Sequence, residues 1–267
     1  MGNTAEFETL RLVYQDSNDA MHRQLWEAVR TGLLFRSEDS YRFLHDRVQE
    51  AAYSLIPMDL RAREHLRIGN LLAAHTPPAK LKETIFKIVN QLNRGAHLLN
   101  SDEERDRVAD LNLIAGRRAK VSTAYASALK YLRVARTLLA ETTWERNYEL
   151  IFSIEYLVAE CELLTAEMSA VEDRLTMLAQ RCKNNHDFAV VTRLQLTLYT
   201  TLDQSDRGVD VLLEFLRRLG TVWSQHPSRD EVIREYDRIW TLVGSRQIEE
   251  LVDLPLMTQT SSTPWMC

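Results

Sequence analysis

Apolar residues recur every three or four positions along most of the chain, which is the spacing of one buried face on an α-helix. The clearest case is the stretch 111–139, whose second half places one apolar stripe at Tyr125, Ala128, Leu132, Ala135 and Leu139. Its first half repeats the pattern with Leu111, Ala115 and Ala119. Between the halves stands Val121-Ser122-Thr123, whose side chains fit a turn or cap better than a helix interior. The stretch therefore predicts two helices that fold back on each other.

Small residues lie where these two helices must approach closely. Gly116, Ala128, Leu132 and Ala135 follow the small-small-large-small spacing of a tetratricopeptide helix pair. The second helices of three successive pairs begin near Ala128, Val171 and Val209, with offsets of 43 and 38 residues by subtraction. These offsets exceed the ~34 residues of an ideal unit. We therefore predict degenerate, lengthened repeats that are similar to tetratricopeptide units.

Two further pairs and a single helix follow. The first pair sets Ile151, Ile154, Leu157, Val158 and Cys161 against Val171, Leu175, Leu178 and Cys182. The second sets Val190, Leu194 and Leu198 against Val209, Leu212, Leu216 and Leu219. The single helix carries Ile233, Tyr236, Trp240 and Val243, and ends at Gly244. Because one pair cannot bury its apolar face alone, we predict an all-α fold of antiparallel pairs stacked as a right-handed solenoid. The last unit lacks a polar cap, so an exposed apolar end is expected, as in a chain cut from something longer.

The N-terminal part has a different pattern. Residues 21–32 predict a helix that ends at Gly32, and residues 33–35 and 41–44 predict a small β-hairpin across the polar turn 36–40. A further helix covers 46–56 and ends at Pro57. These are the parts of a small winged-helix-like unit, although its surface is not basic enough to favour DNA binding. Residues 60–72 continue as helix, and Thr76-Pro77-Pro78 is the best linker candidate. The predicted division is a winged-helix-like unit at 1–76, repeats at 77–258 and an unstructured tail at 259–267.

Composition narrows the class of protein. The 267 residues, 45% of them hydrophobic, suffice for one or two domains with a sizeable core, and eight glycines and six prolines are few for an all-β fold. A net charge of −5 gives no basic excess for nucleic acid or for a membrane surface. No apolar run reaches the ~18 residues of a membrane span, and the first residues lack a signal-peptide pattern. We expect a cytoplasmic protein with protein partners and without nucleic-acid or membrane partners.

Several histidines and one aspartate invite comparison with a helical metal phosphohydrolase of the HD type: His22, His45, Asp46, His65 and His75. The simpler interpretation makes Asp46 the N-cap or first-turn acid of its helix. It makes His45 a buried or half-buried packing residue. A metal site also needs oriented partners around its ligands. We therefore expect no metal site, and the HD-type enzyme remains an alternative.

Other catalytic signatures are missing from the sequence. A phosphate-binding loop needs two glycines five apart followed by Lys and Ser or Thr, and no two glycines have this spacing. No Gly-x-Ser-x-Gly turn occurs. Cys161 and Cys182 are interpreted as small buried hydrophobic residues, and Cys267 has no metal-type pairing. We expect no catalytic residue and no cofactor.

The remaining clusters have structural interpretations. The basic group Arg117, Arg118 and Lys120 is interpreted as a solvated helix face, with a phosphate or acidic partner as the alternative. Four tryptophans are interpreted as core or inter-repeat packing residues: Trp144, Trp223, Trp240 and Trp265.

Several blocks of the sequence resemble a known family. They are YRFLHDRVQEAAYSLIP at 41–57, IFKIVNQLN at 85–93, the stretch 111–131 and WSQHPS at 223–228, and the similarity fades after LVDLPLMT at 251–258. These blocks resemble the end of the predicted ATPase module, of the AAA or STAND type, in large multidomain bacterial signalling proteins. In that family a serine/threonine kinase-like domain precedes the ATPase, and sensor and histidine kinase domains follow it.

The resemblance implies that this chain is a non-catalytic regulatory arm. Its partners would be the ATPase core and the kinase and sensor domains of the parent protein or of a homologous protein. No matched position belongs to a catalytic motif of the family, and the nucleotide-binding loop and the kinase domains are expected to lie outside this chain. A free-standing tetratricopeptide-like adaptor is the alternative from the class of binding proteins.

Overall fold

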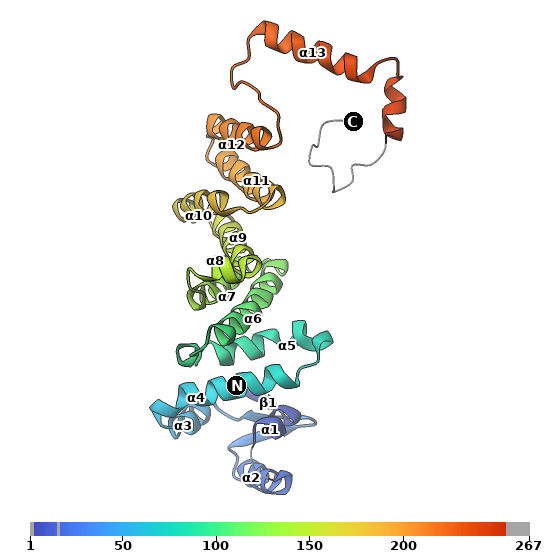
Figure 1. Cartoon of the computed structure of the whole chain (residues 1–267). Helices are drawn as coiled ribbons and strands as arrows, with labels where there is room; N and C mark the ends of the chain where they lie inside the picture. The colour runs from blue at the N-terminus through green and yellow to red at the C-terminus, as the bar shows by residue number, and fades with distance from the viewer. Residues whose placement is uncertain (1–2, 15–16, 255–267) are drawn as a thin grey trace. The chain divides into compact units, whose positions relative to one another are not determined.

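A computed structural model describes residues 3–14 and 17–254 of the chain. The described chain is predominantly helical, with a single small sheet (Figure 1). It divides into two compact units, Met1–Thr165 and Ala166–Cys267, and each is described by itself. The division predicted at residue 76 stays a prediction. The predicted tail at 259–267, with Trp265 and Cys267, lies outside the described residues.

The first unit begins with a three-stranded antiparallel sheet flanked by short helices. In chain order these are β1 Thr4–Glu6, α1 Phe7–Val13, α2 Asn18–Arg30, β2 Leu34–Ser37 and β3 Ser40–Phe43. The strand order is β1-β3-β2, and the β2–β3 register runs from Leu34↔Phe43 to Ser37↔Ser40. The predicted hairpin is confirmed, with a tighter turn than expected. Strand β1 and helix α1 were missed, because a three-residue strand has no readable alternation and pairs with a segment far along the chain.

Three helices follow the sheet: α3 Asp46–Ser54, α4 Met58–His75 and α5 Pro78–Leu92. Thr76 and Pro77 connect α4 to α5, and these two helices pack against each other. A Cβ atom added at Gly69 would lie 2.6 Å from Leu92 Cδ2 and 2.9 Å from the Leu92 nitrogen. Glycine is therefore required at this crossing of α4 and α5. The core continues from α5 into the next helices through Ile85, Ile88, Val89, Leu92, Leu99, Val108, Leu111 and Ala115.

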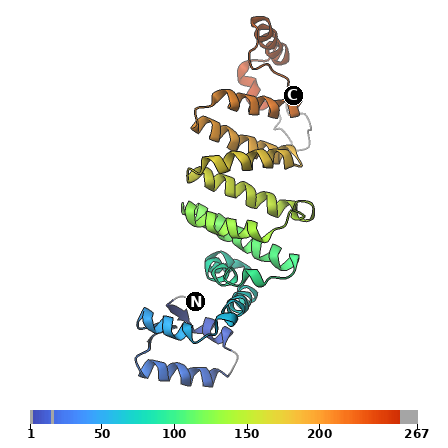
Figure 2. The same cartoon turned by 90° about the vertical axis from the view of Figure 1, so that its left-hand side faces the viewer.

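The predicted central pair is confirmed as α6 Asp102–Val121 and α7 Tyr125–Leu138, which lie side by side (Figure 2). Ser101 caps α6 by accepting a hydrogen bond from the Glu104 amide at 3.1 Å. The chain reverses at Thr123, whose φ is 57°. A Cβ added at Gly116 would lie 2.6 Å from Leu132 Cγ, so the small residue is what lets the helices meet. Ala128, Leu132 and Ala135 are fully buried, as their spacing predicted.

Ion pairs join the last long helix of this unit to the central pair. Two short segments complete the order of elements: η1 Ala96–Leu98 lies between α5 and α6, and α8 Thr143–Arg146 lies between α7 and α9. Helix α9 Tyr148–Leu164 packs against α6 and α7. Arg136 of α7 pairs with Glu155, Arg133 of α7 with Glu162 at 3.5 Å, and Lys120 of α6 with Glu160. The side chains of Glu155 and Glu162 are only 2% exposed. Charged as well as apolar contacts therefore hold α9 in place.

The second unit contains α10 Met168–Arg181, α11 Asn185–Thr201, α12 Ser205–Arg218, α13 Arg229–Val243 and η2 Ile248–Asp253. The predicted faces of α10 and α11 are largely confirmed, since Val171, Leu175, Leu178, Leu194 and Leu198 are buried. Val190 is half-buried instead, and Val191 takes the inward position.

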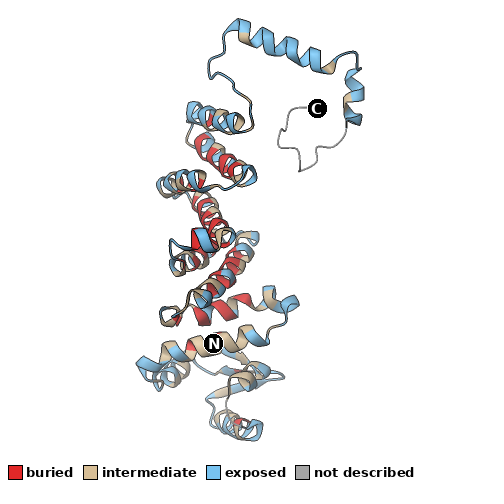
Figure 3. Cartoon of the chain, in the orientation of Figure 1, coloured by how far each residue is buried: buried red, intermediate tan, exposed pale blue. Residues whose placement is uncertain are grey.

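The predicted inward face of α12 is only partly covered, which corrects the expectation for Val209 and Leu212; both are 40% exposed. Helix α13 ends at Gly244 as predicted, but it has no buried residue and is exposed along most of its length (Figure 3). Within residues 3–14 and 17–254, each helix is too short or too polar to cross a lipid bilayer.

Candidate functional site

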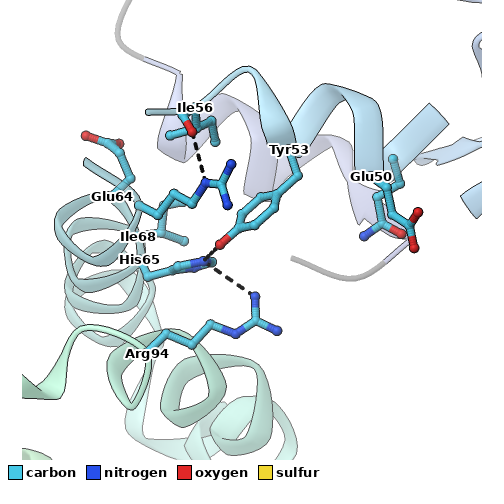
Figure 4. A pocket seen from close by; sticks show the side chains of 9 residues that line it. Glu50, Tyr53, Ile56, Glu64, His65, Ile68 and Arg94 are labelled. Atoms are coloured by element: carbon cyan, nitrogen blue, oxygen red, sulfur yellow. Dashed lines mark hydrogen bonds between the residues drawn. The ribbon is translucent and has the colours of Figure 1, made fainter. Parts of the chain in front are cut away.

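A cleft in the first unit is lined by residues of α3, α4 and the end of α5. Its volume is about 490 Å³, and its walls are Gln49, Glu50, Tyr53, Ile56, Arg61, Glu64, His65, Ile68 and Arg94 (Figure 4). Tyr53 comes from the last turn of α3, Arg61 to Ile68 from the first half of α4, and Arg94 from the turn after α5. Pro57 separates α3 from α4, so Tyr53 and His65 face each other across this break.

Glycine sets the depth at which His65 lies. Gly69, one turn further along α4, allows the close contact with Leu92 described above. A Cβ at Gly95 would lie 2.5 Å from the carbonyl oxygen of Ala62, so this part of the chain also approaches α4 closely. The His65 residue is consequently 7% exposed, although it is flanked by charged residues on the same helix.

Both ring nitrogens of His65 have hydrogen-bond partners. Nδ1 lies 2.6 Å from Gln91 Oε1, and Nε2 lies 3.0 Å from the Tyr53 hydroxyl. A neutral ring satisfies this arrangement by donating from Nδ1 to Gln91 and accepting at Nε2 from Tyr53. Arg94 Nη1 also points toward Nε2, at 3.4 Å. Since both nitrogens are engaged, His65 connects α3, α4 and α5 and has no nitrogen left for a substrate.

Burial lowers the pKa of His65 below its ordinary value of 6.5, and the positive charge of Arg94 lowers the pKa further. The hydrogen bond to Gln91 opposes this shift. Protonation would place a donor at Nε2, where it would face the guanidinium of Arg94 and displace the Tyr53 hydroxyl as donor. The neutral ring is therefore the form that fits the cleft.

Arg61 fixes the orientation of Tyr53. Its guanidinium carbon lies 4.6 Å from the centre of the Tyr53 ring, and its Nε donates to the Ile56 carbonyl oxygen at 2.9 Å. This is cation–π geometry at a partly buried site. Glu64 on the opposite wall pairs with Arg67 at 2.8 Å. The cleft thus combines an aromatic wall with two guanidinium groups and two carboxylates, which suits a polypeptide segment that carries both apolar and charged side chains.

The titration of His65 gives a prediction. Because its pKa is lowered in the folded chain, the unfolded chain binds this proton more readily. The stabilisation is fully present above about pH 6.5 and is lost as the pH falls below this value toward the lowered pKa of the folded state. In urea unfolding from about pH 8 to about pH 5, the wild type should lose more stability than His65→Gln. The other histidines are common to both proteins, so parallel curves would contradict the lowered pKa.

The residues compared with HD-type ligands do not come together. His22 packs its exposed ring on Phe7, His75 contacts the Leu71 carbonyl oxygen at 3.0 Å, and His65 occupies the cleft. Asp46 is the first-turn acid of α3, as predicted, and accepts a hydrogen bond from Asn3 at 3.1 Å. The interpretation of His45 as a buried or half-buried residue is wrong, because it is exposed at the N-cap of α3. In the described ranges 3–14 and 17–254, no three His, Cys, Asp or Glu side chains lie close enough to hold a metal ion.

The basic group on α6 is not a solvated face throughout. Arg117 is exposed, as that interpretation requires. Arg118 instead lies over the Phe86 ring at 5.0 Å and donates to the Lys82 carbonyl oxygen. Lys120 pairs with Glu160. Two of the three cations therefore serve helix packing, because long basic side chains reach across to the neighbouring helices α5 and α9.

The interpretation of the tryptophans as packing residues is also only partly confirmed. Trp144 is buried, which confirms its interpretation as a packing residue. Trp223 and Trp240 are 54% and 46% exposed, so that interpretation is wrong for them. Both lie near or on α13, the helix whose apolar side chains remain uncovered.

The cysteines give a second prediction. Cys161 is buried, as predicted, whereas Cys182 is half-buried at the C-cap of α10. Burial raises the pKa of the Cys161 thiol to about 11, and burial also raises the pKa of Cys182 to about 11. At neutral pH the thiolate population is then about a hundredfold lower than at an ordinary cysteine. In a Cys267→Ser background, a disulfide reagent should label the native chain at least about a hundredfold more slowly than the urea-unfolded chain. Equal rates would show that the two thiols are accessible.

Sequence reasoning singled out His65 but not its partners. Gln91 lies 26 residues beyond His65, and Arg94 lies 29 residues beyond it. No helical period connects positions so far apart. The available signal was Gly69 and Gly95, since glycine in or beside a helix often marks a close approach of two chain segments.

Comparison with known proteins connects the chain with signalling. No protein-family model matches it, and no solved structure matches it. It is 25% identical over 237 residues to "Hybrid signal transduction histidine kinase G" of Dictyostelium discoideum. The alignment covers 80% of this chain and 7% of that protein. The chain thus spans a small part of the length of the relative that it matches, and its similarity is to one part of a signal-transduction protein.

Proposed function

We propose that this predominantly helical chain, similar to one part of a hybrid signal transduction histidine kinase, is a non-catalytic regulatory arm of a larger signalling protein. The observation that carries the proposal is the alignment, which covers most of this chain but a small fraction of the relative. A region of this kind lies among other parts of a long protein and transmits contacts between them. The partners proposed are an ATPase core of the AAA or STAND type and the kinase and sensor domains.

Two architectural assignments belong to the proposal. The order β1-α1-α2-β2-β3 puts two helices before a β-hairpin, which supports a winged-helix-like start. The close packing of α6 on α7 around Gly116 supports a tetratricopeptide-like pair, and α10 to α12 repeat the antiparallel hairpin pattern. We propose that these pairs belong to a right-handed solenoid. A helical arm of this type could bias its neighbours by offering them two alternative packing faces.

The cleft around His65 is the proposed contact with the ATPase core. Its aromatic wall, its two guanidinium groups and its two carboxylates can bind a protruding protein segment without any reacting group. Arg94 is its most accessible cation, since it is exposed while Arg61 is stacked on Tyr53. A carboxylate of the core that reaches this cleft would meet Arg94 first.

The test compares ATP hydrolysis by the ATPase core in three forms: alone, joined to this arm, and joined to the Arg94→Glu arm. We expect the joined arm to change the hydrolysis rate at least about threefold, and Arg94→Glu to restore the rate of the core alone. Arg117→Glu is the matched control, because it makes the same charge change on an exposed helix face away from the cleft. A core that hydrolyses ATP at one rate in all forms would refute the proposal.

A free-standing adaptor is the second candidate, because the cleft is complete within the described part of the first unit. It would bind a peptide of another protein without altering ATP hydrolysis. A peptide library screened against the purified chain distinguishes the two: binding abolished by Arg94→Glu, with no effect of the arm on the ATPase core, would favour the adaptor.

A further inference from the structure

Helix α12 presents an apolar stripe that its neighbours leave partly open. Val209, Leu212, Leu216 and Leu219, here called the α12 stripe, are spaced three, four and three residues apart and share one side of the helix. Val209 and Leu212 are 40% exposed. The corresponding residues of the earlier second helices, such as Leu132 of α7 and Leu175 of α10, are fully buried. Of the predicted apolar stripes on α7, α10 and α12, the α12 stripe is therefore the one with exposed members.

Helix α13 has a matching stripe. Ile233, Tyr236, Trp240 and Val243, here called the α13 stripe, repeat the spacing of three, four and three. The first three side chains are 46–59% exposed, and no residue of α13 is buried. Helix α13 has only 15 residues. A helix of this length is marginally stable in water and normally depends on packing of its apolar face. The capping box of Ser228 and Glu231 fixes where α13 begins but does not replace that packing.

The order of the helices along the chain indicates that α12 is the helix against which the α13 stripe packs. At two earlier junctions a helix packs against the next long helix of the chain: α7 against α9, and α10 against α11. Helix α12 is the second helix of its pair, and α13 is the next helix in the chain. Residues 219–228 connect them, a span close to that of residues 139–147 between α7 and α9. A connection of this length lets α13 reach α12 in the same way.

We infer that α13 docks on the α12 stripe of its own chain and forms the first helix of a further pair. The two stripes then cover each other, while Arg234, Glu235 and Arg238 on the other side of α13 remain in solvent. The short connection favours this contact over the same contact with a second copy, because a tethered segment has an effective concentration in the millimolar range. The inference goes beyond the proposed function and does not depend on any ATPase core.

Amide hydrogen exchange of the full chain tests the docking. In the wild type, the amides of residues 233–243 should exchange at least about a hundredfold more slowly than in an unstructured peptide. Leu212→Asp alters only α12, yet it should speed exchange in α13 at least about tenfold. Leu242→Asp is the control: it lies on α13 opposite the α13 stripe, and it should leave the exchange of α12 unchanged.

Each result decides the inference. Exchange in α10 and α11, which belong to the same unit as α12, shows whether a variant is still folded. Wild-type α13 that exchanges as fast as an unstructured peptide would overturn the docking, as would equal exchange in wild type and a folded Leu212→Asp. Protection of α13 that disappears on dilution, together with a dimer in light scattering, would assign the contact to a second copy and also overturn it. Protection that is independent of concentration and lost in Leu212→Asp supports docking within one chain.

Discussion

Replacing Leu132 with alanine is expected to lower the free energy of unfolding by about 3 kcal/mol, because it leaves a cavity in a closely packed helix pair. Leu132 is fully buried, and its Cγ lies where a Cβ of residue 116 would be only 2.6 Å away. Urea unfolding followed by circular dichroism measures this loss. A loss below about 1 kcal/mol would mean that the site is not packed as described.

Gly116 allows a stricter test of the same contact, because the effect of Gly116→Ala on the free energy of unfolding should change sign when Leu132 is replaced by alanine. In the wild type, Gly116→Ala should destabilise by about 1–3 kcal/mol, since its new methyl group overlaps Leu132. In Leu132→Ala the overlap is gone, and alanine should stabilise the helix by up to about 1 kcal/mol relative to glycine. Effects that add within about 0.5 kcal/mol in the double-mutant cycle would contradict the direct contact.

The second large effect is expected at Arg136, which pairs with the buried carboxylate of Glu155. Arg136→Met should lower the free energy of unfolding by about 3 kcal/mol, because it removes a cation from a carboxylate that is withdrawn from water. The double variant Arg136→Met and Glu155→Gln should recover part of this loss, since the buried charge is then gone as well. Chemical denaturation of the wild type, Arg136→Met and the double variant at neutral pH measures both steps.

An exposed pair provides the control. Arg238 and Glu235 of α13 lie 3.5 Å apart, with side chains 66% and 49% exposed. Arg238→Met should change the free energy of unfolding by less than about 0.5 kcal/mol, because water screens this pair. Equal losses of stability from Arg136→Met and Arg238→Met would show that burial of Glu155 does not determine how much its ion pair stabilises the fold.

The helices could be predicted because their signal is local. The spacing of Leu111, Ala115 and Ala119, and of Ala128, Leu132 and Ala135, fixes which side of each helix is buried. One helix end was also readable, since Gly244 is an ordinary capping residue. The hairpin before α3 followed from two short apolar runs around a polar turn.

The cleft and the ion pairs could not be predicted in the same way. His65, Gln91 and Tyr53 come from three helices, and only the packed structure brings them together. Arg136 and Glu155 are 19 residues apart, on helices whose relative rotation no periodicity reports. The hydrophobic pattern also failed to show exposure: it places Trp240 on an apolar stripe, which predicts burial, but Trp240 is 46% exposed.

Binding between this chain and the separately made ATPase core tests the proposed role most directly. In isothermal titration, the intact chain should bind the core with a dissociation constant in the micromolar range, about 1–100 μM, and Arg94→Glu should weaken binding at least about tenfold. Arg117→Glu should leave it unchanged. Absence of binding at about 100 μM by a folded chain, or equal weakening by both substitutions, would contradict the assignment of this helical arm as a partner of the core.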